Sequence, residues 1–355
     1  MREAQPSDEV ENNGNDSELL RVAIIGAGSA GMTATKQILE TAAKSASKVD
    51  VVVFERRGNV GGIWQYDEDV KSGYLAWESE QATLQPVEEG GGQRKSRLRY
   101  GWENKWPPGA MFDGLRTNIP SDLMAYRDAP FAPDTNLFPS RKTVQQYLEG
   151  YAKRHNLLSC IRFNTIVTIL KKTDHSKQWL IKTKSSLNDP SISTSKEDGY
   201  ESFSHVIVCH GRCNTPNIPN ISGLETFKGR VLHSAWYRDP SKIMERDILV
   251  VGNASSGMDI ARELSGYITR DLPSGLSPNQ WKEKCKKDPF NVYSSWHSLE
   301  KPPPMDFSPL DPDSPDWCRK IKVLDQILQI NGNDIHFKDG TVFHDIKLLI
   351  FETMG

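Results

Sequence analysis

The segment Val22–Gly31, which reads VAIIGAGSAG, decides the fold of this chain. A short apolar run predicts a buried strand, and the apolar spacing that follows predicts a helix. Between them lie Gly26, Gly28 and Gly31. The first glycine permits a tight turn, the second lets the backbone approach a pyrophosphate, and the third lets the helix pack on the strand. The segment therefore predicts a Rossmann-like dinucleotide-binding unit.

The next predicted strand, Val49–Phe54, supports this interpretation because it ends at Glu55. An acid at the end of the second strand can accept hydrogen bonds from ribose hydroxyls and repels a 2′-phosphate. The first glycine turn is therefore predicted to bind FAD or NAD in preference to NADP.

A second glycine turn follows the apolar run Ile248–Val251 and reads GNASSG over residues 252–257. Alanine occupies the place of the middle glycine, while two serines can donate hydrogen bonds to phosphate. One such turn predicts a nucleotide-binding protein, and two favour a pair of cofactors that exchange electrons. The predicted fold class is α/β, with two Rossmann-like dinucleotide-binding domains.

The strand predicted after the second turn, Asn291–Ser295, is followed by Trp296 and His297 rather than by an acid. The absence of an acid there favours NADP over NAD. No arginine stands nearby to bind the 2′-phosphate. On balance the second turn is predicted to bind NADPH.

Composition sets broad limits on the protein. The chain has 355 residues, 37% hydrophobic and 25% charged, with a formal net charge of −2. It is long enough for two domains, and its charge gives no general attraction to nucleic acid. No apolar run approaches the ~20 residues of a membrane span. Five scattered cysteines without a CxxC pair predict reduced thiols, no metal site and a cytoplasmic location.

Three further motifs carry a family resemblance. They are Gly61-Gly62-x-Trp64 after Glu55, Leu115-x-Thr117-Asn118-x-Pro120, and Phe227-x-Gly229-x-x-x-His233-x-x-x-Tyr237. Together with the two glycine turns, they resemble the class B flavin-containing monooxygenases. The fungal and yeast-like branch is the most similar, because its members also have an insertion before the Leu-x-Thr-Asn segment.

The resemblance implies an oxidoreductase that uses NADPH and O2. NADPH at the second turn would reduce FAD at the first. The reduced flavin would capture O2 as a C4a-hydroperoxide, and a soft nitrogen or sulfur atom of a small molecule would take up the distal oxygen. Baeyer–Villiger monooxygenases have tryptophan where this chain has Tyr237, so heteroatom oxygenation is favoured over insertion beside a ketone.

The residues to which the resemblance assigns roles form three groups. Asn118 is placed beside the flavin and nicotinamide as the catalytic residue, and a neutral amide suits that position. The cofactor-binding group comprises Gly26, Gly28, Ser29, Ala30, Gly31, Glu55, Gly62, Ile63, Trp64, Thr117, Asn118, Gly252, Ser255, Ser256 and Gly257. Phe227, Gly229, His233 and Tyr237 form a linker motif, in which the histidine is expected to hold structure rather than to donate a proton.

The expected domain order follows from these motifs. A disordered tail is predicted over residues 1–20 and an FAD domain over 21–212, with an insertion at about 67–105. An NADPH domain is predicted over 213–347, inserted in the FAD domain. Residues 348–355 approach the start of the family's return linker and then stop, which predicts a C-terminally truncated form.

Two alternatives remain open from the sequence. The chain could be a flavin-dependent NAD(P)H reductase that transfers no oxygen. The absence of a CxxC pair argues against a disulfide reductase, and the motif from Phe227 to Tyr237 argues against a plain diaphorase. It could also be a catalytically silent truncated remnant. Substrate identity and oligomeric state are not predicted.

Overall fold

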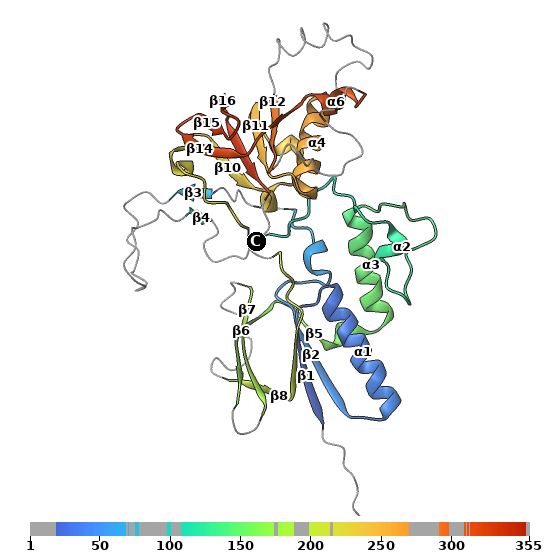
Figure 1. Cartoon of the computed structure of the whole chain (residues 1–355). Coiled ribbons are helices and arrows are strands. Elements are labelled where there is room, and N and C mark those ends of the chain that lie inside the picture. The colour runs from blue at the N-terminus through green and yellow to red at the C-terminus, as the bar shows by residue number, and fades with distance from the viewer. Residues whose placement is uncertain are drawn as a thin grey trace, which may run out of the picture. The chain divides into compact units, whose positions relative to one another are not determined.

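The structure is a computed structural model, and it folds into two compact units (Figure 1). It describes residues 19–68, 70, 75–77, 98–100, 108–173, 177–187, 199–213, 216–269, 291–297, 309, 311 and 313–352. The first unit comprises Met1–Gly62 with Leu148–His210, and the second comprises Ile63–Tyr147 with Gly211–Gly355. Among the described residues, no helix combines the length and the apolar character that a membrane span requires.

The first unit is built on a parallel sheet with the strand order β5-β2-β1-β9. Its strands are β1 (Leu20–Ile25), β2 (Val49–Phe54), β5 (Ile161–Arg162) and β9 (His205–Val208), and α1 (Ser29–Ser45) connects β1 to β2. Ile25 pairs with Phe54 in the parallel register, so the residues that follow both strands meet at one edge of the sheet. This edge holds the first glycine turn and Glu55.

A smaller antiparallel sheet completes the first unit. It contains β6 (Thr165–Lys172), β7 (Trp179–Ser185) and β8 (Glu201–Phe203). Its buried residues Ile181 and Phe203 pack with residues of β1 and β2 in one hydrophobic core. The 3-10 helix η2 (Leu157–Cys160) leads into β5.

The second unit is built on a five-stranded parallel sheet with the order β10-β17-β11-β12-β13. The strands are β10 (Arg230–His233), β17 (Leu348–Phe351), β11 (Asp247–Val251), β12 (Asn291–Ser295) and β13 (Ile321–Leu324). Helix α4 (Ser255–Thr269) begins just after β11, as the second glycine turn predicts. Strands β17 and β11 are apolar and buried along most of their length, as expected for the middle of a parallel sheet.

Shorter elements surround this sheet. Strands β14 (Ile327–Asn331), β15 (Asp334–Phe337) and β16 (Val342–Phe343) form an antiparallel sheet whose apolar side chains share a core with β11 and β17. The remaining elements are α2 (Ser121–Met124), α3 (Arg141–Arg154), α6 (Asp316–Arg319), β3 (Leu75–Trp77), β4 (Leu98–Tyr100), η1 (Gly62–Trp64), η3 (Leu224–Thr226), η4 (Ser234–Trp236) and η5 (Pro240–Lys242). The residues of α3 up to Tyr147 belong to the second unit, and those from Leu148 belong to the first.

The structure differs from the sequence expectations over residues 348–351. These residues, expected to begin a linker, form the strand β17 between β10 and β11, because all four side chains are apolar and buried. Strand β9 lies at the edge of its sheet, where it pairs with β1 and is partly exposed.

Residues 63–147 group with the second compact unit, and the domain bounds 21–212 and 213–347 remain predictions. Of the tail expected over residues 1–20, only 19 and 20 are described, and β1 begins at Leu20. Most of the insertion expected at about 67–105 also lies outside the described residues, apart from a few positions that include β3 and β4.

Candidate dinucleotide-binding sites

The first glycine turn has a backbone that only glycine can adopt. Gly26 has φ +105°, and a Cβ there would lie 2.5 Å from the carbonyl oxygen of Cys209. A Cβ at Gly31 would overlap the carbonyl oxygen of Gly26. These two contacts confirm the packing reason for the first and third glycines of the motif.

The middle glycine faces a second glycine segment. A Cβ on Gly28 would lie 3.5 Å from the Cα of Gly62, and Gly62 itself has φ +58°. The N–H of Gly61 donates to the carbonyl oxygen of Ala27 at 3.0 Å. Two stretches of backbone without side chains therefore meet beside the N-terminus of α1. No side chain caps that end of α1, where Ser29 and Ala30 are exposed, so it fits a pyrophosphate.

Glu55 lies buried beside this turn, with 5% of its surface exposed. Its Oε2 accepts a hydrogen bond from the N–H of Ala27 at 2.7 Å, and its Oε1 accepts one from the N–H of Arg57 at 2.9 Å. The acid thus fixes the turn to the end of β2. Each carboxylate oxygen has a further lone pair, which leaves acceptor capacity for a ribose hydroxyl.

Ile63 and Trp64 follow Gly62 directly in the 3-10 helix η1. The side chain of Ile63 is 42% exposed, and that of Trp64 is partly buried. An exposed isoleucine next to a glycine turn is compatible with a flavin-side contact, the role that the resemblance implies for this pair.

The second turn repeats the backbone of the first within its own unit. Gly252 has φ +115°, and a Cβ on it would overlap the carbonyl oxygen of Glu352. A Cβ on Gly257 would overlap the carbonyl oxygen of Gly252. The residues between them, Ala254, Ser255 and Ser256, are exposed or partly exposed at the N-terminus of α4. The second turn is therefore also shaped for a phosphate-bearing ligand.

The sequence analysis missed Glu352, which lies against both glycines of the second turn. Its side chain is 4% exposed, and its carboxyl group accepts a hydrogen bond from the N–H of Gly257. Its Oε2 has no hydrogen-bond partner among the described residues. Burial raises the pKa of Glu352 to about 7, and the Gly257 N–H opposes this rise only in part.

The segment that contains Asn118 contacts the second turn. The side-chain amide Nδ2 of Asn118 donates to Oγ of Ser255 at 3.2 Å. Thr117 is buried, and its hydroxyl donates to the carbonyl oxygen of Ile119 at 2.9 Å. Asn118 is exposed, so its amide remains open to a ligand at the N-terminus of α4.

The end of β12 offers no acid to a ribose. Ser295 donates to the carbonyl oxygen of Asp325 at 2.8 Å, and the indole N–H of Trp296 donates to Oγ of Ser294 at 3.0 Å. His297 is exposed and is the last described residue of this segment. Within residues 291–297, nothing would repel a 2′-phosphate.

The linker motif is built into the second unit. Phe227 lies in the hydrophobic core, and a Cβ on Gly229 would lie 2.5 Å from the Phe227 ring and 2.6 Å from the carbonyl oxygen of Lys347. The buried His233 accepts the N–H of Ala235 through Nδ1 at 3.1 Å and so caps η4. This ring nitrogen acts as an acceptor, which fits a structural role for the histidine.

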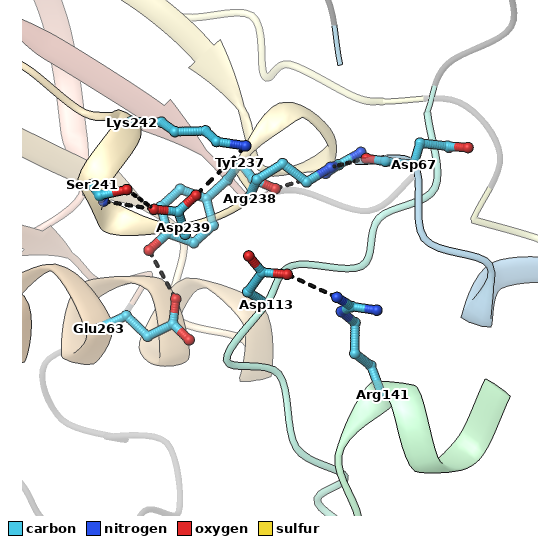
Figure 2. A network of polar contacts seen from close by, with 9 residues as sticks. All are labelled: Asp67, Asp113, Arg141, Tyr237, Arg238, Asp239, Ser241, Lys242 and Glu263. Carbon is cyan, nitrogen blue, oxygen red and sulfur yellow. Dashed lines mark hydrogen bonds and ion pairs between the residues drawn. The ribbon is translucent and has the colours of Figure 1, made fainter. Parts of the chain in front are cut away.

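Tyr237, the last residue of the motif, is part of a polar network (Figure 2). Its hydroxyl donates to Oε2 of Glu263 on α4 at 2.8 Å. The buried guanidinium of Arg238 donates to the carbonyl oxygens of Asp67, Gly109, Ala235 and Tyr237. Burial raises the pKa of Glu263 to about 7, although the Tyr237 hydrogen bond lowers it. The network ties the segments before Asn118 to the linker motif and α4.

Two glycine turns of the same design, one with a ribose-side acid and one without, define a protein of the class that binds two dinucleotides. Family models agree with this class. Residues 105–279 match the flavin-binding monooxygenase-like family, and residues 23–158 match an FAD-NAD(P)-binding family. Over residues 105–279 the chain is similar to the flavin-binding monooxygenase-like family.

Individual relatives are similar to this chain over part of their own length. Flavin-containing monooxygenase FMO GS-OX5 of Arabidopsis thaliana is 31% identical over 70% of this chain and 47% of its own length. Trimethylamine monooxygenase of Roseovarius sp. (strain 217) is 29% identical over 94% of this chain and 60% of its own length. The chain therefore spans about half to three-fifths of these relatives.

A solved structure supports the fold. S-allyl-L-cysteine S-oxygenase from Allium sativum superposes with a TM-score of 0.65 at 20% identity, over 95% of this chain and 63% of the other. At this identity the likeness shows a common fold.

Proposed function

We propose that this chain carries the FAD and NADPH sites of a monooxygenase that oxygenates nitrogen or sulfur atoms of small molecules with O2. The observation that carries the proposal is the pair of matching glycine turns, in a chain whose residues 105–279 match the flavin-binding monooxygenase-like family. Glu55 beside the first turn suits FAD, and the lack of an acid at the described end of β12 suits NADPH at the second.

The first turn would hold FAD through backbone groups. The N–H groups at the N-terminus of α1 face the pyrophosphate position, and Glu55 has acceptor capacity for ribose hydroxyls. Gly28 and Gly62 pack against each other beside this N-terminus, so two stretches of bare backbone would lie next to the pyrophosphate. When bound, FAD supplies the redox and oxygen chemistry, while the protein supplies binding, orientation and exclusion of water.

The second turn would hold NADPH at the N-terminus of α4. Ser255 and Ser256 offer hydroxyl donors to phosphate, and the amide of Asn118 is held beside Ser255. We propose that Asn118 orients the reacting groups as a neutral hydrogen-bonding side chain, which has no proton to lose at this position. His233 and Tyr237 would maintain the fold of the loop that precedes the second turn rather than transfer protons.

Relatives and residues both favour a heteroatom substrate. The names of two similar proteins refer to trimethylamine and to the sulfur of S-allyl-L-cysteine. The linker motif ends in tyrosine at position 237. The resemblance implies that tryptophan at this position would favour a ketone substrate. A soft amine or sulfide is therefore the proposed substrate class.

The proposal is tested with the purified full chain, FAD and NADPH in air, with methimazole or a thiol as acceptor. We expect bound flavin, NADPH consumption that depends on flavin, and oxygenated acceptor identified by mass spectrometry. NADPH oxidation that yields only hydrogen peroxide would point to the reductase alternative. A chain that binds neither cofactor would contradict the proposal.

A further inference from the structure

The carboxyl group of Glu352 occupies an unusual place for an acid, directly beneath a dinucleotide turn. A methyl group at Gly252 would lie 3.4 Å from its Oε2, and one at Gly257 would lie 3.4 Å from its Cβ. The side chain therefore contacts both glycines that shape the second turn. A bound pyrophosphate would sit at the N-terminus of the same helix, α4.

The first turn shows that the fold itself does not require an acid at this place. There, Gly26 packs against the carbonyl oxygen of Cys209, and a Cβ on Gly31 would lie 3.6 Å from the Cβ of Cys209. Cys209 and Glu352 thus occupy equivalent positions in the two turns, each one residue after a parallel strand that pairs with the strand leading into its turn. The small side chain of Cys209 lies at the first turn, and the buried carboxyl group of Glu352 lies at the second.

This carboxyl group competes with a ligand for the same backbone donors. The first N–H groups of a helix have no partner within the helix and bind anions. Glu352 accepts the N–H of Gly257, which belongs to the first turn of α4, and so withdraws one of these donors. Its other oxygen, Oε2, is buried and has no partner among the described residues. A buried oxygen in this state favours the protonated acid.

We propose that Glu352 sets the strength of dinucleotide binding at the second turn: the neutral acid permits the pyrophosphate to bind, and the carboxylate anion weakens it. The inference rests on the proposed function, which assigns a dinucleotide to this turn. The neutral acid adds no charge and gains an O–H donor, whereas the anion brings negative charge to the end of α4 where the pyrophosphate must lie.

The titration range supports this role. The pKa of Glu352 is raised by burial to about 7, so both forms of the acid are present near neutral pH. Titratable or charged side chains on the described elements around it are Arg230 and His233 on β10, Asp247 on β11, and Asp259, Arg262, Glu263 and Tyr267 on α4. Burial is the main cause of the raised pKa of Glu352, and the hydrogen bond from Gly257 opposes it.

The test measures binding of ADP-ribose by calorimetry to the full chain with saturating FAD. ADP-ribose has a pyrophosphate diester and no 2′-phosphate, so its charge does not change near neutral pH. If only the neutral acid permits binding, linkage to a pKa of about 7 makes the dissociation constant roughly tenfold larger at pH ~8 than at pH ~6. Glu352→Gln, an uncharged mimic of the acid, is expected to bind equally at both pH values.

Two variants control this experiment. Glu263→Gln removes the other acid of this unit with a pKa of about 7, away from the glycines of the turn, and is expected to keep the wild-type pH dependence. Glu352→Cys introduces the residue found at the equivalent place in the first turn, and is expected to behave as Glu352→Gln does. Circular dichroism and flavin content establish that each variant is folded.

The outcomes separate the inference from the proposed function. Equal wild-type binding at both pH values, or an unchanged pH dependence in folded Glu352→Gln or Glu352→Cys, would overturn the role of Glu352 while dinucleotide binding stands. Failure of folded wild-type protein to bind ADP-ribose at either pH would overturn the proposed function of the second turn together with the inference.

Discussion

The hydroxyl of Tyr237 donates a hydrogen bond of 2.8 Å to Oε2 of Glu263, and this bond joins the linker motif to α4 (Figure 2). The segment before Asn118 packs against the same acid, because a Cβ on Gly114 would overlap Oε1 of Glu263. The partly buried carboxyl group of Glu263 thus contacts three stretches of the second unit that are distant in sequence.

Tyr237→Phe should therefore lower stability. The substitution keeps the ring but leaves the Glu263 carboxyl group without this donor, which costs about 1–3 kcal/mol in the free energy of unfolding. Urea unfolding followed by circular dichroism measures the effect. Tyr200→Phe, at a ring that is 40% exposed, is the matched control and should change stability little. An equal effect of the two substitutions would mean that the Tyr237 hydrogen bond contributes nothing of its own.

The two glycine turns should be separable by mutation. Gly31→Ala places a methyl group on the carbonyl oxygen of Gly26 and should abolish flavin retention. Gly257→Ala makes the corresponding clash with Gly252 and should abolish NADPH binding while flavin remains bound. Flavin absorbance after gel filtration and NADPH titration measure the two losses.

Gly266→Ala is the control for the second turn, because it lies on the same helix with open space at its Cβ position. Alanine there should leave both cofactors bound and raise stability by about 0.5–1 kcal/mol through helix propensity. Loss of flavin binding in Gly257→Ala would reverse our assignment of the turns. So would a Gly31→Ala variant that loses NADPH binding and keeps its flavin.

Glu55→Gln should weaken FAD binding. The amide keeps the size of the side chain but has one acceptor oxygen, whereas Glu55 accepts the N–H groups of both Ala27 and Arg57. The amide NH2 group would face one of these donors, so we expect the dissociation constant for FAD to rise about tenfold, equivalent to ~1.4 kcal/mol. Fluorescence titration with FAD checks this, and wild-type affinity in the variant would contradict the role of the acid.

Stability should depend on pH mainly through Glu263 and Glu352, the acids of the second unit whose pKa values burial raises most among the described residues. The pKa values of Glu263 and Glu352 are raised from the usual 4.5 to about 7. Between these values the folded chain binds more protons than the unfolded chain, so the free energy of unfolding falls as pH rises and levels off above pH 7. We expect on the order of 1 kcal/mol from each acid, given that both retain some contact with solvent.

Urea unfolding at several pH values measures this slope. The double variant Glu263→Gln with Glu352→Gln should flatten it between pH ~5 and ~7. A slope that survives in the double variant would assign the pH dependence to other groups.

Asn118→Ala should affect the reaction more than the fold. The exposed amide bonds to Ser255 at 3.2 Å, so its loss should cost little stability. If Asn118 orients the reacting groups, NADPH oxidation should continue while a larger share of it yields hydrogen peroxide instead of oxygenated methimazole. An unchanged ratio of product to NADPH consumed would remove Asn118 from the proposed catalytic role.

Several parts of the fold followed from local pattern. The spacing of Gly26, Gly28 and Gly31 predicts the βαβ unit, and the structure agrees because β1, α1 and β2 follow one another directly along the chain. The same reasoning places α4 directly after β11. Glu55 at the end of β2 was also predicted, although its hydrogen bonds to two backbone N–H groups were not.

Other features depended on which distant segments pair, and a local pattern does not encode that. Leu348–Phe351 is an apolar run near the end of the chain, and its position in the middle of the second sheet follows from its pairing with both β10 and β11. Because this strand was not predicted, neither was Glu352 at its end. The network of Arg238 likewise joins backbone oxygens from three separate segments.

The central claim is that the first turn binds FAD, the second binds NADPH, and a hydride passes between them. Anaerobic mixing of NADPH with the FAD-loaded chain, followed by the visible absorbance of the flavin, tests it most directly. We predict that NADPH bleaches the flavin in the wild-type chain and in Gly266→Ala, but not in Gly257→Ala, which keeps its FAD. An FAD-loaded wild-type chain whose absorbance does not change, or equal bleaching in Gly257→Ala, would contradict the account.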